Sequence, residues 1–323
     1  MRERIPVIRL RNKSGDVRAR EGVVLCFFMR RSHGEVAPAL WRALETYVRA
    51  IPPNSLNWYG TYDGDTLPLD DKGWAHIRQR MLDSPLANGC LVELEELCGE
   101  VGSYHFEYHG KRLDAPLHAH NEGETTALSF SFSTEYLLEH GPAHLRALAL
   151  DIARELPLSF GYASLAVVTP RGGWYPVRKE LLGLLCHYYG LDFYHLHGTS
   201  RRIGTGARGA YWLTFLGQPL LGHLGGTERL RQQLSFPEVS FQPMEGDRLL
   251  ISLGEWPEAL DTTQGQYVPQ YHELACLLEP YFPDETMGWT PVDKNNMYHW
   301  LRRLCRVPWS REIHEDGDTP TAS

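Results

Sequence analysis

The stretch that most constrains the fold of this chain is residues 128–169, which read LSFSFSTEYLLEHGPAHLRALALDIARELPLSFGYASLAVVT. Apolar residues and serines alternate over 128–133, which indicates a strand with one buried face. Gly141 and Pro142 mark the start of a helix, whose apolar residues recur every three or four positions until Pro157 ends it. Strand alternation then returns over 163–167. The order strand, helix, strand predicts a unit in which a helix covers one face of a sheet.

The remainder of the chain shows the same succession of short apolar runs and amphipathic segments. We expect further strands at 22–30, 89–97, 102–109, 191–198 and 209–217, and two within 236–253. We expect helices at 36–50, from Asp70 or Asp71 to about Leu82, and at 176–189, 226–234, 268–282 and 293–305. This pattern predicts an α/β (α+β) fold with helices packed on mixed, largely antiparallel sheets. The strand 128–132 should be central, and Tyr211–Leu216 should be buried.

The domain organisation predicted from these elements is simple. Residues 1–20 form an N-terminal extension, residues 21–310 form the folded domain, and the polar residues 311–323 form a disordered acidic tail. Residues 22–50 and 128–156 both run strand, loop, helix, proline, so two similar halves at 21–120 and 125–310 are possible. Two unrelated α/β units would give the same pattern, because the pattern is common.

Bulk properties narrow the class of partner and compartment. The 323 residues carry a formal net charge of −8, which disfavours a nucleic-acid-binding surface and suits a basic protein partner. Six cysteines occur without a C-x-x-C pair, as expected of free thiols in a reducing compartment. No run approaches the roughly 18 apolar residues of a membrane span. We therefore expect a cytoplasmic protein.

Histidines are the strongest candidates for catalysis or metal binding. His105, His109, His118 and His120 precede Glu122 and Glu124, and His195 and His197 flank one residue of an expected strand. Such groups can ligate zinc or non-haem iron, but no closed ligand set is evident, and packed or surface histidines are the competing interpretation.

Other sequences that resemble enzyme motifs lack the neighbouring residues or structure that those motifs require. Gly204–Gly209 resembles a phosphate loop but lacks the helix and lysine that such a loop needs. Cys186 and His187 are adjacent, so they lie on different faces of a helix and cannot act as a nucleophile and its base. We expect no catalytic site, no metal and no cofactor.

Acidic and aromatic residues gather in three loops that could form a binding surface. The first holds Trp58, Tyr59, Tyr62, Asp63, Asp65, Asp70 and Asp71; the second holds Trp174 and Tyr175; the third holds Glu255, Trp256, Glu258 and Asp261. Ordinary turn chemistry and core packing would explain the same residues, and Asp70 or Asp71 could cap a helix. The functional interpretation is a set of aromatic anchors with a negative rim, which suits a cationic protein partner.

Three segments carry a family resemblance: residues 132–167, 206–226 (GARGAYWLTFLGQPLLGHLGG) and 248–280 (RLLISLGEWPEALDTTQGQYVPQYHELACLLEP). They resemble the type VI secretion immunity family, described as type VI immunity for VRR-Nuc effectors and formerly as a domain of unknown function. The resemblance covers roughly residues 20–305, and its motifs carry no catalytic meaning.

The resemblance implies a non-enzymatic immunity protein of the bacterial cytoplasm. Such a protein binds a cognate type VI secretion effector, a restriction-endonuclease-like DNase, and occludes its active site or DNA-binding groove, without contacting nucleic acid or membrane. An acidic chain suits the basic groove of such a toxin. The alternative that stays open is a metal-dependent enzyme with a His-rich site near His105–His120.

Overall fold

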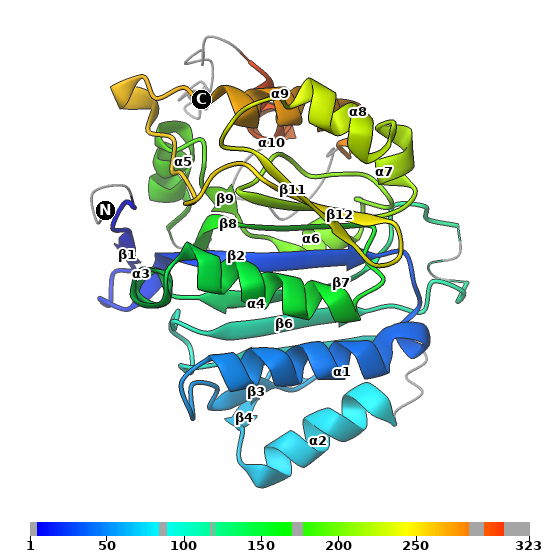
Figure 1. Cartoon of the computed structure of the whole chain (residues 1–323). Helices are drawn as coiled ribbons and strands as arrows, with labels where there is room; N and C mark the ends of the chain where they lie inside the picture. Colours follow the sequence, from blue (N-terminus) through cyan, green and yellow to red (C-terminus); the bar gives the residue numbers. More distant parts are fainter. Residues whose placement is uncertain are drawn as a thin grey trace, which may run out of the picture.

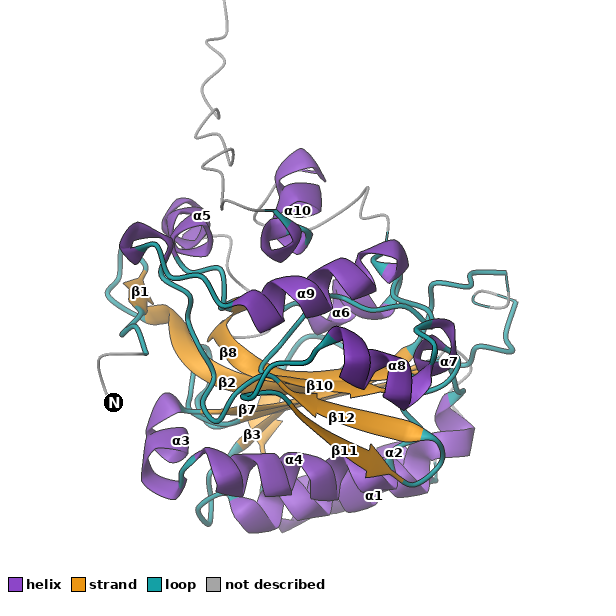
Figure 2. Ribbon diagram, turned by 45° about the horizontal axis from the view of Figure 1, so that its top comes forward, coloured by secondary structure: helices purple, strands orange, loops and turns teal. Residues whose placement is uncertain are grey.

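One sheet of 12 strands organises the protein, with helices on both of its faces (Figures 1 and 2). The computed structural model describes residues 5–83, 89–116, 118, 120–169, 177–283 and 294–306. The strand order is β11-β12-β10-β8-β2-β7-β6-β5-β3-β4, with β1 paired to β2 and β9 paired to β8. The pairing of β8 with β9 is parallel, while the other strand pairs of the described chain are antiparallel. The expected class, helices on a mixed and largely antiparallel sheet, is confirmed.

The strands are short at the edges of the sheet and long at its centre. They are β1 (Arg9–Arg11), β2 (Val17–Met29), β3 (Trp58–Gly60), β4 (Thr66–Pro68), β5 (Cys90–Glu95), β6 (His105–Gly110), β7 (Thr126–Phe132), β8 (Phe160–Val168), β9 (Asp192–Phe193), β10 (Leu213–Leu216), β11 (Ser240–Met244) and β12 (Arg248–Ser252).

The helices divide between the two faces of the sheet. Figure 2 shows α1 (His33–Ala50), α2 (Asp71–Leu82), α3 (Thr134–His140) and α4 (Pro142–Glu155) on one face. On the other face lie α5 (Arg178–His187), α6 (Leu196–Ser200), α7 (Leu220–His223), α8 (Gly226–Gln233), α9 (Pro269–Leu278) and α10 (Lys294–Leu301). Short 3₁₀ turns lie at Thr262–Gln264, before α9, at Glu279–Tyr281, after α9, and at Arg303–Cys305, after α10. No helix in the described part of the chain is both long and apolar enough to span a bilayer.

The centre of the sheet is β2 between β7 and β8. β2 is buried on both faces from Ala19 to Met29, as its apolar run VVLCFFM requires. Because β2 pairs antiparallel with both neighbours, β7 and β8 run parallel to each other, and α3 and α4 cross over β2 to connect them. The expected strand–helix–strand unit and the central place of 128–132 are confirmed. A strand from the first half of the chain separates the two strands of that unit.

Aromatic packing joins α1 to the sheet. The Tyr47 ring lies 4.9 Å from Phe130 and 5.1 Å from Phe132, centroid to centroid, and its hydroxyl donates to the Ser131 carbonyl at 2.6 Å. Each fully buried phenylalanine contributes about 1.5–3 kcal/mol of transfer free energy. This packing fixes which face of β7 points toward α1, so the serines of β7 point to the opposite face of the sheet.

Three expectations need adjustment. Residues 191–198 were expected to form one strand, but β9 ends at Phe193 and α6 begins at Leu196, so His195 is the N-cap of α6 and His197 lies in its first turn. The short strand ends there because the chain turns to lay α6 against β6 and β7. In the segment 209–217 only Leu213–Leu216 is a strand, although Tyr211–Leu216 is buried as expected. Residues 9–11 and 17–20 belong to β1 and β2, so part of the expected extension 1–20 pairs within the sheet. The Gly- and Asp-rich region 55–70, for which the sequence allows a loop or a short hairpin, holds the hairpin β3–β4.

Some expectations fall on residues that the structure does not describe. Trp174, Tyr175 and the tail 311–323 lie outside the described residues. The duplication of halves stays a prediction, although the helices that would correspond, α1 and α4, pack side by side on the same face (Figure 1).

Candidate functional site

Strands β5 and β6 turn a row of polar side chains away from α1. Their alternation places Val92, Leu94, Phe106 and Tyr108 in the core and Glu93, Glu95, His105, Glu107 and His109 on the opposite side, named here the acidic face. The antiparallel register sets Glu93 opposite Glu107 and Glu95 opposite His105. Glu93, His105 and His109 are half-buried, while Glu95 and Glu107 are buried. Carboxylates held next to one another in this way present concentrated negative charge.

The acidic face continues into the hairpin that sequence analysis selected. Trp58 of β3 pairs with Glu95, and His105 pairs with Ser131 of β7, so Trp58, Glu95, His105 and Ser131 form one row across four strands. Trp58 is half-buried, so part of its ring remains accessible. The row joins an aromatic side chain to carboxylates on one surface.

A hydrogen-bond network holds Glu107 at the centre of the acidic face. One carboxylate oxygen lies 2.6 Å from His109 Nε2, and the other accepts from the Tyr194 hydroxyl. Burial alone would raise the pKa of Glu107, but the hydrogen bond and charge of His109 and the hydrogen bond of Tyr194 lower it to about 2. Glu107 is therefore a permanent anion at neutral pH.

The two histidine groups noted in the sequence partly converge. His109 Nδ1 and His197 Nδ1 are 3.4 Å apart, with ring centroids at 5.0 Å. Burial lowers the pKa of the neighbouring His195 to about 4, so that ring is neutral at physiological pH. These contacts bring together residues that are some 90 positions apart in the chain.

The remaining residues of the first histidine group lie elsewhere. His118 Nδ1 is 3.7 Å from Glu124, whose carboxylate also pairs with the buried Lys111 ammonium. His120 and Glu122 are exposed. Within the described residues, no three His, Cys, Asp or Glu side chains are grouped closely enough to hold a metal ion.

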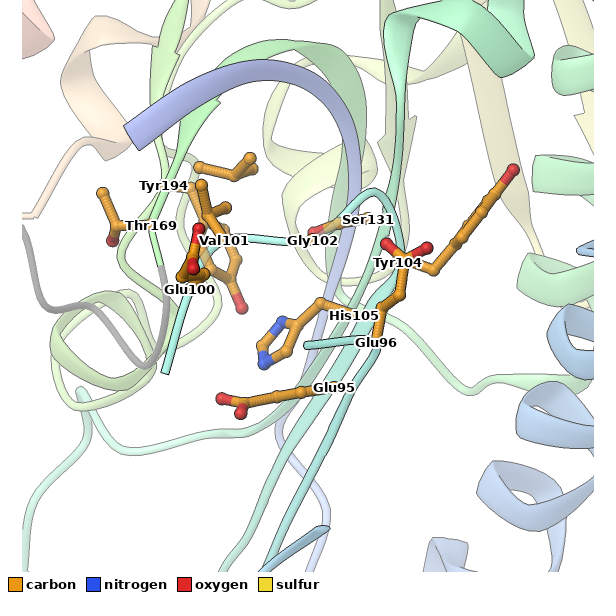
Figure 3. Close-up of a pocket in the computed structure, with 11 residues that line it drawn as sticks. Glu95, Glu96, Glu100, Val101, Gly102, Tyr104, His105, Ser131, Thr169 and Tyr194 are labelled. Carbon is orange, nitrogen blue, oxygen red and sulfur yellow. The ribbon is translucent and has the colours of Figure 1, made fainter. Parts of the chain in front are cut away.

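A small recess opens at the end of the acidic face, where β5, β7 and β8 end (Figure 3). Its volume is about 20 Å³, and its polar lining comprises Glu95, Glu96, Glu100, Tyr104, His105, Ser131, Thr169 and Tyr194. Figure 3 shows the Glu95 and His105 side chains pointing to the same side, as their cross-strand pairing requires. Sequence analysis selected His105 as a member of the histidine group but not Glu95, although alternation in the expected strands 89–97 and 102–109 indicates their common face.

The loop between β3 and α2 separates into core, cap and surface residues. Tyr59 is buried against His76 of α2. Asp70 is the N-cap of α2, accepting from Gly73 N at 2.9 Å. Tyr62 is 54% exposed, with the Arg80 guanidinium 4.5 Å from its ring centroid. Asp63, Asp65 and Asp71 are exposed. Tyr62, Asp63, Asp65 and Asp71 thus remain available to a partner.

The third acidic–aromatic group lies away from the first. Trp256 lines a cleft of about 910 Å³ with residues of α3 and the N-terminal segment. Glu258 and Asp261 line a second cleft of about 500 Å³ beside Tyr188, and Glu255 is exposed. Asp261 caps the turn Thr262–Gln264 and lies 3.1 Å from His187 Nε2. Neither cleft includes any residue of the Trp58–Asp71 loop.

Comparisons with known proteins identify a similar fold and a family. No curated protein matches the sequence. The fold is similar to that of the Pseudomonas aeruginosa T6SS protein PA0821, with a TM-score of 0.77 and 19% identity, over 93% of this chain and 88% of that one. Residues 39–304 match the family model TsiV, described as type VI immunity for VRR-NUC. Because that match spans most of the chain, the protein belongs to the TsiV family of type VI immunity proteins.

Proposed function

We propose that this protein neutralises a cognate type VI nuclease effector by binding it one-to-one and occluding its active site or DNA-binding groove. The family supports an immunity role directed at a VRR-Nuc effector. The observation that carries the mechanism is the acidic face, where the half-buried Glu93 and Trp58 lie on the same side of the sheet as the buried carboxylates Glu95 and Glu107. The partner is a restriction-endonuclease-like DNase, and the encounter takes place in the cytoplasm, where its DNA substrate lies.

Charge complementarity explains why such a surface would compete with DNA. A nuclease must present basic side chains to the phosphate backbone. Carboxylates on a rigid sheet offer those side chains a pre-organised substitute and accelerate the encounter through long-range attraction. Trp58 and Tyr62 supply the aromatic contact area that anchors protein interfaces.

The exposed aspartates of the Trp58–Asp71 loop test this assignment. The variant D63S/D65S/D71S removes three surface carboxylates and leaves the Asp70 cap in place. Association with the purified effector should slow roughly tenfold at low salt and become less salt-dependent, because these charges attract a basic partner before contact. Biolayer interferometry over a salt series measures both effects.

A matched control removes the same charge from the opposite edge of the sheet. Glu228, Glu238 and Glu245 are exposed around α8 and β11, so E228S/E238S/E245S changes net charge equally at a distant place. Thermal unfolding must show that both variants are folded. Equal association rates for the two triple variants would show that the β3–α2 loop is not part of the interface.

A further inference from the structure

Three buried polar atoms around the recess have no hydrogen-bond partner among the residues that the structure describes. They are His105 Nε2, Ser131 Oγ and Thr169 Oγ1, and all three residues line the same recess. Ser131 is 3% exposed and Thr169 is 5% exposed, so bulk water does not satisfy their hydroxyls. Buried polar groups without partners are rare because each costs about 1–3 kcal/mol of desolvation. Three at one place indicate a site that is completed by another group.

The charge around the recess indicates whether the group that completes it is a cation or an anion. Glu95, Glu96 and Glu100 all contribute to its lining (Figure 3). Among the described residues, Arg18 pairs with Asp16 at 3.4 Å, although its buried Nε has no partner there, and Arg20 pairs with Glu135 at 2.8 Å. The recess is therefore electronegative, and a cation with hydrogen-bond donors is the complementary ligand.

The size of the recess selects among cations. A volume of about 20 Å³ admits one or two water-sized groups. A lysine ammonium is compact and carries three N–H donors, whereas the arginine guanidinium is a broad planar fork. Three unpaired atoms that can each accept a hydrogen bond, together with a water-sized space, suit the ammonium.

We infer that this recess receives the ammonium group of a lysine side chain from the effector. The inference rests on the proposed function and adds a specific chemical contact to it. Hydroxyl oxygens of Ser131 and Thr169 and the Nε2 lone pair of the His105 imidazole would accept from the ammonium, with the surrounding carboxylates balancing its charge. A lysine that a nuclease uses to hold DNA phosphate is of the chemical type required.

Two shape-preserving variants test the contact. S131A and T169V each remove one unpaired hydroxyl, so the unfolding free energy of the unbound protein should be unchanged or higher. Affinity for the purified effector should fall on the order of tenfold in each variant, mainly through faster dissociation. The control is E238Q, which replaces an exposed glutamate between α8 and β11 and should bind like the wild type.

Lysine footprinting identifies the ligand directly. The effector, alone or in complex, is treated with an acetylating reagent, and each lysine is quantified by mass spectrometry. One effector lysine should be protected by wild-type protein and regain reactivity, at least partly, in the T169V complex. If instead T169V destabilises the unbound protein and leaves affinity and protection unchanged, the recess holds only structural water and the inference fails.

The outcomes also separate this inference from the proposed function. If the wild-type protein forms no complex with the effector, the proposed function fails. If it forms a tight complex in which S131A and T169V bind normally and no lysine is selectively protected, the proposed function stands and the lysine contact is wrong. Insertion of an arginine, seen in a crystal structure of the complex, would also overturn the contact.

Discussion

The charge on Glu107 should make the stability of this protein depend on pH in the acid range. Glu107 is 7% exposed and is held by His109 and Tyr194, which bring its pKa to about 2 from an ordinary value of 4.5. A carboxylate whose pKa is lowered by folding stabilises the folded state above its unfolded pKa, and loses that contribution as pH falls toward the folded pKa. A shift of this size corresponds to about 3 kcal/mol at pH 7.

The variant E107Q isolates this contribution. Glutamine keeps the size and can still accept from the Tyr194 hydroxyl, but it presents no charge to His109. E107Q should therefore lower the unfolding free energy by about 2–3 kcal/mol at pH 7. The difference from the wild type should shrink to about half by pH 3, because the wild-type carboxylate is then partly neutralised on unfolding.

Urea unfolding followed by circular dichroism from pH 7 to pH 3 measures this difference. Other carboxylates titrate in both proteins, so their effects cancel when the two curves are subtracted. E238Q provides the baseline for losing an exposed carboxylate. A difference between E107Q and wild type that is zero, or that stays constant over this range, would refute the ionised and paired state of Glu107.

Three further substitutions probe the framework of the fold. D192N should destabilise the protein by about 3–5 kcal/mol in urea unfolding, because Asp192 is fully buried and its ion-pair partner Arg208 would keep an uncompensated charge. G190A should cost roughly 2–4 kcal/mol, because a Cβ there would lie 2.0 Å from the Glu258 carbonyl oxygen. G183A in α5, where a Cβ meets nothing within 4 Å, should instead raise the melting temperature slightly.

The hydrophobic periodicity of the sequence was sufficient to predict that helices pack on a sheet. The serine–phenylalanine alternation of 128–133 predicted a strand with one buried face, and Phe130 and Phe132 do pack against α1. The serine face is buried as well, so the expectation of one open face was wrong. The strand order could not be predicted, because the pairing of β2 with β7 and β8 depends on contacts between residues about 100 or more positions apart. His195 and His197 were misplaced on a strand because alternation over a few residues does not distinguish a strand from a turn followed by a short helix.

The candidate site was predictable only in part. Trp58 and the aspartates of its loop were selected by composition, and the structure places Trp58 opposite Glu95. The recess was missed, since Ser131 and Thr169 are common strand residues whose unpaired hydroxyls become significant only after the strands assemble. Their signal is the absence of a hydrogen-bond partner, which a sequence does not contain.

Hydrogen–deuterium exchange on the complex with the effector tests the central claim most directly. If the acidic face binds the toxin, backbone amides of the β3–β4 hairpin and of residues 96–104 should exchange more slowly in the complex, together with amides at the edge of β5. Amides of β11 and α8, at the opposite edge of the sheet, should be unaffected. Protection confined to the clefts around Trp256 and Asp261, with none at β3 and β5, would contradict the proposed interface.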